Sequence, residues 1–356
     1  MDVAHPESPV VEPALTSRAR EVHDRAVVVN GLVGSSSVPA DVAGAAELAR
    51  VMRAGGVTAV NLTIALDAGF AQTIPTFMRA LRAIEQTEGI RVALTGRDIA
   101  DAKAQAEAAI IFGFQNADPI ENRLEYLQAF HRLGLRILQL TYQRRNLLAD
   151  GCGEEADAGL SIFGRSVIEE CNRLGILIDL SHVGYRATME AIDASAAPVS
   201  FTHVDLQRFN PVPRNKTDEQ VRALAQRGGV VGFNAVARLV SPHGRVRGAT
   251  VDELLEQIDH AVELVGVDHV GLGLDINEGM TEDDFMRRRE TFLTDYPELK
   301  MGGDFPFEYY YVTGLNTMAN MGLITDGLLA RGYADDHVLK ILGGNLLRLC
   351  TAIWGS

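Results

Sequence analysis

The sequence is short of basic residues and has no long hydrophobic run. Lysine and arginine number 33 against 47 aspartate and glutamate residues, for a formal net charge of −14, and no basic cluster interrupts this acidic balance. We therefore expect no nucleic-acid partner. The longest apolar stretches, such as AAIIFGF and GGVVGF, are too short to cross a bilayer, so we expect no membrane partner. The first twenty residues hold three prolines and several acids but no apolar signal-peptide core, which predicts a cytoplasmic protein.

Cysteine is also scarce, with only Cys152, Cys171 and Cys350 in 356 residues. An odd number of cysteines without a CxxC pair predicts reduced thiols rather than a disulfide framework. Cys171 and Cys350 lie in helix-like segments and are expected in the core. Cys152 lies in the polar stretch Asp150-Gly-Cys-Gly-Glu-Glu, where we expect an exposed thiol that is incidental rather than catalytic.

The sequence does contain a regular alternation of short apolar runs and helix-like segments. Hydrophobic residues make up 47% of the chain, and the runs are nearly continuous, as expected for parallel strands buried on both faces. The eight predicted strands are Val27–Val33, Val57–Ile64, Ala109–Phe114, Ile137–Thr141, Ile176–Ser181, Val199–His203, Gly229–Phe233 and His269–Gly273. The helix-like segments between them are Glu47–Ala54, Ile74–Thr87, Pro119–Leu133, Gly164–Leu174, Arg186–Ala194, Glu219–Arg227 and Val251–Val265.

This alternation predicts an α/β fold of the (β/α)8 TIM-barrel type. Residues 25–356 are expected to form a single barrel domain after an N-terminal extension over residues 1–24. A final helical pair, Gly322–Arg331 and Asp335–Trp354, is expected to pack outside the barrel. A doubly wound sheet is the alternative, but no glycine-rich phosphate turn follows the first strand.

Candidate functional residues lie where the predicted strands end, because a TIM barrel builds its active site at the C-terminal ends of its strands. His182 and His203 end neighbouring strands. Such strands lie about 5 Å apart, so both imidazoles are placed to reach one zinc ion. The alternative for each is a structural histidine. Gln115, Asn116 and Tyr142 follow two other strands.

Two charged residues complete this set. Asp275 follows the last strand, where a carboxylate serves as a general base, a metal ligand or an anchor for a substrate ammonium group. The alternative for Asp275 is a helix N-cap or a loop hydrogen bond. Arg214 lies in a loop after the sixth strand, and its guanidinium fork matches a substrate carboxylate. The alternative for Arg214 is a surface ion pair.

Six short motifs follow one another along the chain. They are Asp179-Leu-Ser-His182, Thr202-His203, Pro213-Arg-Asn-Lys216, Gly228-Gly-Val-Val-Gly232, Gly271-Leu-Gly-Leu-Asp275 and Gly343-Gly-Asn-Leu-Leu-Arg348. Together they resemble the membrane (renal) dipeptidase family of zinc peptidases, which are related to the amidohydrolase barrels. The resemblance implies a metallo-dependent-hydrolase-like barrel, a small amino-carboxylate substrate, a homodimer and a two-zinc site. The family's last two zinc ligands match His182 and His203, its carboxylate-binding arginine matches Arg214, and its strand 8 aspartate matches Asp275.

The chain departs from the family pattern at the remaining positions. The family's His-x-Asp pair falls on Leu32 and Gly34, its bridging glutamate on Gln115, and the histidine that polarises the scissile carbonyl on Tyr142. A metal ion at the first site is therefore not expected. The second site keeps two imidazoles and an amide oxygen without an anionic ligand, so we expect at most one zinc ion, with Asp275 as a further ligand if it reaches. Tyr142 is expected to donate a hydrogen bond to an oxyanion.

These residues predict a membrane-dipeptidase-like hydrolase that acts on a dipeptide or a small amide with a free carboxylate. One alternative is a metal-free or repurposed enzyme acting on a small amino or N-substituted carboxylate, and another is a catalytically silent binding protein. The assigned roles are catalytic for Asp275 and Tyr142, substrate-binding for Arg214, Gln115 and Asn116, and metal-binding for His182 and His203.

Overall fold

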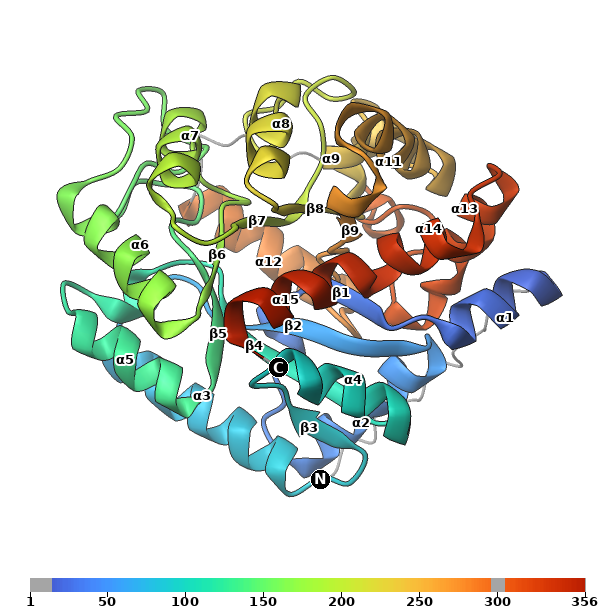
Figure 1. The fold of residues 1–356 in the computed structure, drawn as a ribbon, viewed down its shortest axis with the longest axis horizontal. Coiled ribbons are helices and arrows are strands. Elements are labelled where there is room, and N and C mark those ends of the chain that lie inside the picture. The colour runs from blue at the N-terminus through green and yellow to red at the C-terminus, as the bar shows by residue number, and fades with distance from the viewer. Residues whose placement is uncertain (1–14, 296–304, 356) are drawn as a thin grey trace.

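A computed structural model describes residues 15–295 and 305–355 (Figure 1). Eight strands in the described part follow one another in the order β1-β2-β4-β5-β6-β7-β8-β9, all parallel, and β3 pairs with β4 off this path. The strands are β1 (Val28–Val33), β2 (Val57–Ala65), β3 (Ile90–Val92), β4 (Ala108–Phe114), β5 (Leu135–Gln139), β6 (Leu177–Asp179), β7 (Ser200–Val204), β8 (Val230–Phe233) and β9 (Val270–Leu272).

The sheet curls until its two edge strands meet. The amide of Gly34 donates to the carbonyl of Ile276 at 2.9 Å, and the amide of Asp275 donates to the carbonyl of Leu32 at 3.2 Å. The result is a nearly closed eight-stranded barrel, so the predicted TIM barrel is confirmed. Each of the eight predicted strands is present, with ends that differ by a few residues.

Helices alternate with these strands and cover the outside of the barrel (Figure 1). Several begin at a capping side chain, such as Ser161 before α6 and Thr250 before α11. The helices are α1 (Ser17–Arg25), α2 (Val42–Ala54), α3 (Phe70–Glu85), α4 (Gly96–Gln105), α5 (Leu124–Leu133), α6 (Ile162–Leu174), α7 (Tyr185–Ala194), α8 (Asp218–Gln226), α9 (Ala237–Val240), α10 (Gly244–Arg247), α11 (Val251–Val265), α12 (Glu282–Asp295), α13 (Gly322–Ala330), α14 (Asp335–Leu339) and α15 (Asn345–Trp354).

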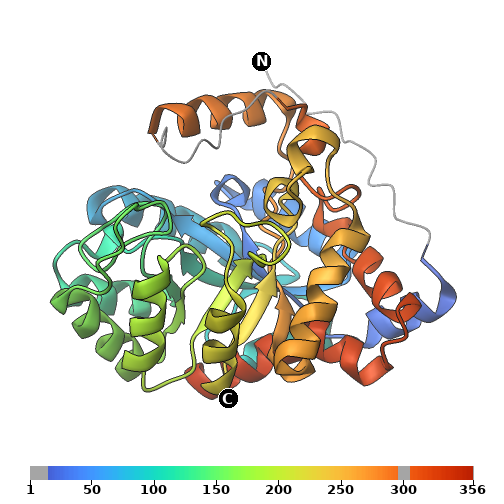
Figure 2. The same cartoon turned by 90° about the horizontal axis from the view of Figure 1, so that it is seen from above.

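The two ends of the barrel are covered by different helices. On the N-terminal side of the strands, Leu346, Leu349 and Cys350 of α15 pack with strand residues such as Val29 and Ile111 in an inner apolar cluster. Figure 2 shows α15 at this end and α12 at the opposite one. The strand ends predicted to carry the chemistry therefore lie on the side of α12. None of the described helices is long and apolar enough to cross a membrane.

The structure corrects the prediction for Cys152, which is buried, like Cys171 and Cys350. Its amide donates to the carbonyl of His182 at 2.7 Å, and its thiol donates to Oε1 of Gln143 at 3.1 Å. The polar loop around Cys152 folds back onto the segment after β6, and the loop's polar groups bond to one another. Local polarity therefore did not indicate exposure here.

Candidate active site

His182 and His203 are brought together at the C-terminal ends of β6 and β7, as the sequence predicts. Their Nε2 atoms lie 3.1 Å apart, and both side chains are buried. Because β6 and β7 are adjacent parallel strands, residues that follow their ends lie side by side. The two imidazoles form the centre of the candidate site.

Asp179, at the end of β6, fixes the position of both histidines. Its buried carboxylate accepts hydrogen bonds from the amides of Ser181 and Thr202, both at 3.0 Å, and from their hydroxyls, at 2.5 Å and 2.7 Å. Burial raises the pKa of Asp179, and these four hydrogen bonds counter that rise. Asp179 thus ties together the segments that carry His182 and His203.

The same hydrogen bonds assign the imidazole tautomers. Thr202 donates its hydroxyl proton to Asp179 and therefore accepts from Nδ1 of His203 at 2.8 Å. His203 then has an unprotonated Nε2, which accepts from Nε2 of His182. Nδ1 of His182 remains as a buried acceptor with no partner among the described residues. Burial and the charge of Arg214 lower the pKa of both imidazoles well below the ordinary value, so both are neutral at pH 7.

Tyr142 lies against this pair. Its ring stacks on the ring of His182 with centroids 4.4 Å apart and an interplanar angle of 27°. Burial raises the pKa of the Tyr142 phenol above its ordinary value, which keeps the hydroxyl protonated at neutral pH. Tyr142 can therefore donate a hydrogen bond but does not supply a negative charge.

Arg214 is buried at the same strand ends, so it does not form the surface ion pair considered as its alternative. Nη1 donates to the carbonyl of Ser181 and Nη2 to the carbonyl of His203, both at 2.7 Å. A guanidinium carries five N–H groups, so these two bonds fix the fork and leave three N–H groups for other acceptors. That arrangement suits a substrate carboxylate.

Asp275 follows β9 in a left-handed backbone conformation, with φ of 56°. A non-glycine residue in this region is uncommon and costs conformational energy, which is found more often at functional sites. Its alternative role as the N-cap of the next helix does not hold, because Thr281 bonds the first turn of α12. Burial raises the pKa of Asp275, and Arg288, Arg214 and Arg238 lower it.

Gln115 and Asn116 follow β4, and their side chains bond to protein groups. The amide nitrogen of Gln115 donates to the hydroxyl of Thr63 at 2.9 Å. The amide nitrogen of Asn116 donates to Asp67 at 2.9 Å and to Asp118 at 3.0 Å, which occupies both of its N–H groups. Substrate contacts from Gln115 and Asn116 stay predictions.

The end of β1 carries no metal-binding side chain. Leu32 is 1% exposed, and a Cβ atom on Gly34 would lie 2.1 Å from Oδ1 of Asn277. Ser36 donates to the same Oδ1 at 2.6 Å, and Nη1 of Arg288 donates to it at 3.2 Å. The amide of Asn277 therefore fills the space into which a side chain at position 34 would project.

These residues do not fit a two-zinc centre. Among the described residues, no group of three or more His, Cys, Asp and Glu side chains is placed to hold a metal ion. Zinc binding through Nε2 of His182 would also move that ring's proton to Nδ1, for which the described residues provide no acceptor. The side chains whose charges act on His182 include Arg214, Lys216 and Arg238, and positive neighbours disfavour a divalent cation.

Sequence reasoning missed three charged residues close to these strand ends. Arg238 lies on α9 and Arg288 on α12, and both lower the pKa of Asp275. Asp205, just past the end of β7, is fully buried, and neither carboxylate oxygen has a hydrogen-bond partner in the described part of the chain. The H-x-D spacing from His203 was a visible signal for Asp205. Arg238 and Arg288 had none, because neither ends a strand.

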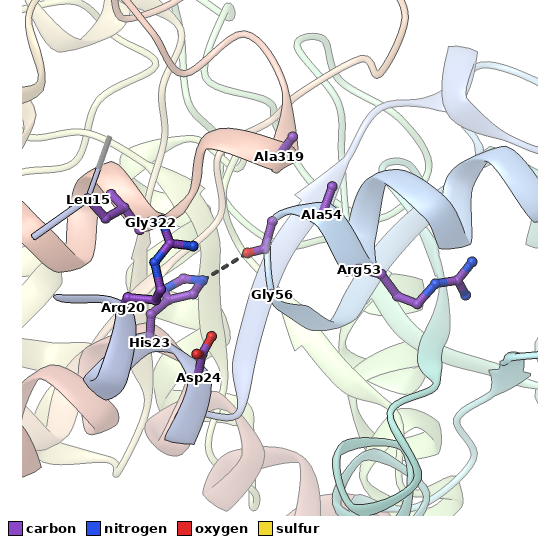
Figure 3. A pocket seen from close by; sticks show the side chains of 10 residues that line it. Leu15, Arg20, His23, Asp24, Arg53, Ala54, Gly56, Ala319 and Gly322 are labelled. Carbon is purple, nitrogen blue, oxygen red and sulfur yellow. Dashed lines mark hydrogen bonds between the residues drawn. The ribbon is translucent and has the colours of Figure 1, made fainter. Parts of the chain in front are cut away.

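A cavity of about 190 Å³ lies elsewhere, between α1, α2 and α13 (Figure 3). His23 lines it, with Nδ1 bonded to the hydroxyl of Thr325 at 2.7 Å and Nε2 to the carbonyl of Gly55 at 2.8 Å. Both ring nitrogens are therefore used in joining α1 to its neighbours. The role of His23 is structural.

The nearly closed parallel barrel, with its candidate site at the C-terminal strand ends, has the fold of the metallo-dependent hydrolases. The family model described as "Membrane dipeptidase (Peptidase family M19)" matches residues 18–284. The chain belongs to this membrane dipeptidase family. The matched region includes the strand ends and Asp275 but ends before Arg288.

Individual relatives agree with this membership. The dipeptidase tcpJ of Claviceps purpurea is 29% identical over 245 residues, which cover 68% of this chain and 50% of that protein. The chain spans about half the length of this relative. An amidohydrolase structure from Pseudomonas aeruginosa is 32% identical with a TM-score of 0.85, covering 95% of this chain and 99% of that one. A Rhodobacter sphaeroides metallopeptidase bound to a phosphinate mimic of L-Ala-D-Ala shares the fold, at 21% identity, a TM-score of 0.73, and coverage of 92% of this chain and 99% of that one.

Proposed function

We propose that this protein is a dipeptidase-like hydrolase that cleaves the amide bond of a dipeptide or another small amide carrying a free carboxylate. The observation that carries the proposal is the buried guanidinium of Arg214, held by two strand-end carbonyls beside the histidine pair. A buried cation with unused N–H groups binds an anion well, and the family and the names of its dipeptidase relatives point to dipeptides.

The roles of the other side chains follow from their chemistry. Arg214 binds the substrate carboxylate and so orients the amide bond. Asp275 acts as the general base that takes a proton from water, and its raised pKa makes the carboxylate a stronger base than one in water. Tyr142 donates a hydrogen bond to the oxygen on which negative charge develops. The neutral tautomers of His182 and His203 let protons pass between the two rings.

We further propose that the site works with at most one metal ion. If one zinc ion binds, His182 and His203 hold it, and it supplies Lewis-acid polarisation of the substrate carbonyl. Two observations favour the alternative, in which the chain's own acids and bases hydrolyse the amide without a metal ion. Nδ1 of His182 has no partner among the described residues, and basic side chains surround that ring. A cytoplasmic location and a homodimer are part of the same proposal.

A matched pair of substrates tests the proposed function. A panel of dipeptides is assayed beside the corresponding dipeptide amides, which lack the terminal carboxylate but keep the scissile bond. Loss of a charge-assisted pair is expected to lower kcat/KM for the amides by about a hundredfold. The proposal fails if neither metal-depleted nor zinc-loaded protein hydrolyses any dipeptide, or if free acids and amides react equally well.

A further inference from the structure

Helix α12 places Arg288 over the end of the barrel that carries the candidate site. Phe285 is 3% exposed and contacts the rings of Phe305 and Tyr310, with centroids 5.4 Å away in each case. Arg288 is three residues further along α12 and so lies on the same face as Phe285. Figure 2 shows α12 across this end of the barrel, and the bond from Arg288 to Asn277 fixes the guanidinium beside the end of β9.

A second guanidinium, that of Arg238, also lies close to Tyr310. The Cζ atom of Arg238, on α9, lies 6.0 Å from the centre of the Tyr310 ring, the same ring that contacts Phe285. Nη1 of Arg238 is buried and has no hydrogen-bond partner among the described residues. Tyr310 therefore links the two segments that carry Arg238 and Arg288.

The positive charges of both guanidinium groups lower the pKa of a candidate site residue, Asp275. Arg288, Arg214 and Arg238 are the charged neighbours that lower the pKa of Asp275. Arg214 is held separately, by the carbonyls at the ends of β6 and β7. The site thus has one cation fixed at the histidine pair, a second beside Asn277 after β9, and a third on α9 next to Tyr310.

We propose that Arg288 and Arg238 bind a second carboxylate, so that the preferred substrate is a small dicarboxylate such as an amide with an acidic side chain. This inference rests on the proposed function for the first carboxylate, which Arg214 binds. A second carboxylate can accept a hydrogen bond from the buried Nη1 of Arg238, which has no partner among the described residues, and an anion is favoured where three arginines lie near Asp275. The planar fork of arginine matches a carboxylate in particular.

Calorimetric titration with two probes tests this proposal, and kcat/KM replaces the inverse of the dissociation constant as the quantity compared if the protein hydrolyses them. N-acetyl-L-glutamate and N-acetyl-L-glutamine have nearly the same shape, but the second lacks the side-chain carboxylate. We expect the dissociation constant of N-acetyl-L-glutamate to be lower by about tenfold or more. In Arg288→Gln this preference is expected to disappear while the affinity for N-acetyl-L-glutamine stays unchanged, and Arg238→Gln is expected to reduce the preference.

Arg287→Gln is the matched control, because Arg287 lies on the same helix but is exposed and pairs with Asp284. It should keep the preference. Equal affinities for the two probes in the parent, no binding of N-acetyl-L-glutamate, or an unchanged preference in both Arg288→Gln and Arg238→Gln would overturn the inference. Binding can be measured without turnover. If the protein hydrolyses no amide but Arg288→Gln abolishes the preference for N-acetyl-L-glutamate, the proposed function is refuted and this inference stands. If the protein hydrolyses amides but does not distinguish the two probes, this inference is refuted and the proposed function stands.

Discussion

Replacing Arg214 with glutamine is expected to lower kcat/KM for a carboxylate-bearing dipeptide by about a hundredfold or more. The substitution removes the charge that faces the substrate carboxylate. It keeps an amide nitrogen that can still donate to the carbonyls of Ser181 or His203. The measurement is kcat/KM for the dipeptide and for its amide. The loss should be confined to the free acid, so that Arg214→Gln hydrolyses acid and amide at similar rates.

Arg208→Gln provides the control for this experiment, because Arg208 is an exposed arginine in the same loop. Its kcat/KM should equal that of the parent protein. An equal loss for acid and amide in Arg214→Gln would show that Arg214 supports the strand ends without binding the carboxylate.

Replacing Asp179 with asparagine is expected to reverse the tautomers of the histidine pair. An asparagine Nδ2 in place of Oδ2 would donate to the hydroxyl of Thr202, which would then donate its own proton to Nδ1 of His203. The His203 proton moves to Nε2. Proton transfer through the pair is then disrupted, and kcat is expected to fall by about a hundredfold or more.

Nitrogen-15 NMR of the imidazoles reads this change directly. In the parent, we expect a protonated Nδ1 on His203 and a protonated Nε2 on His182. In Asp179→Asn, the protonated nitrogen of His203 should be Nε2. The thermal melting temperature serves as the control for folding, since asparagine keeps an oxygen acceptor for the amides of Ser181 and Thr202. Unchanged tautomers with unchanged kcat would contradict the positioning role of Asp179.

The barrel was predictable because its strands leave a direct trace in the sequence. A parallel strand buried on both faces is an almost continuous apolar run, as in β4 and β2, where every residue is buried. Strand β3 was missed because it has three residues, two of them half-buried, and contains Arg91. Helix α4 was also missed, although its Thr95–Asp98 capping box is visible in the sequence.

The site was predictable only where it depends on neighbouring strand ends. His182 and His203 meet because consecutive strands of the barrel are adjacent in space. Arg238 and Arg288 come from α9 and α12, whose positions depend on packing against Tyr310 rather than on the strand order. Protonation sites of the imidazoles depend on hydrogen-bond directions around Asp179, which residue spacing does not encode. The exposure predicted for Cys152 was wrong for the same reason, since burial depends on the packing of its loop.

The central claim is that this member of the membrane dipeptidase family does not use the family's two-metal centre. Metal content per chain, measured by mass spectrometry after zinc saturation and again after chelation, with dipeptide hydrolysis assayed in each sample, tests it most directly. We expect no more than one zinc ion per chain at saturation, and hydrolysis after chelation if the chain's own acids and bases suffice. Two zinc ions per chain, with activity that is lost on chelation and restored by zinc, would contradict the claim.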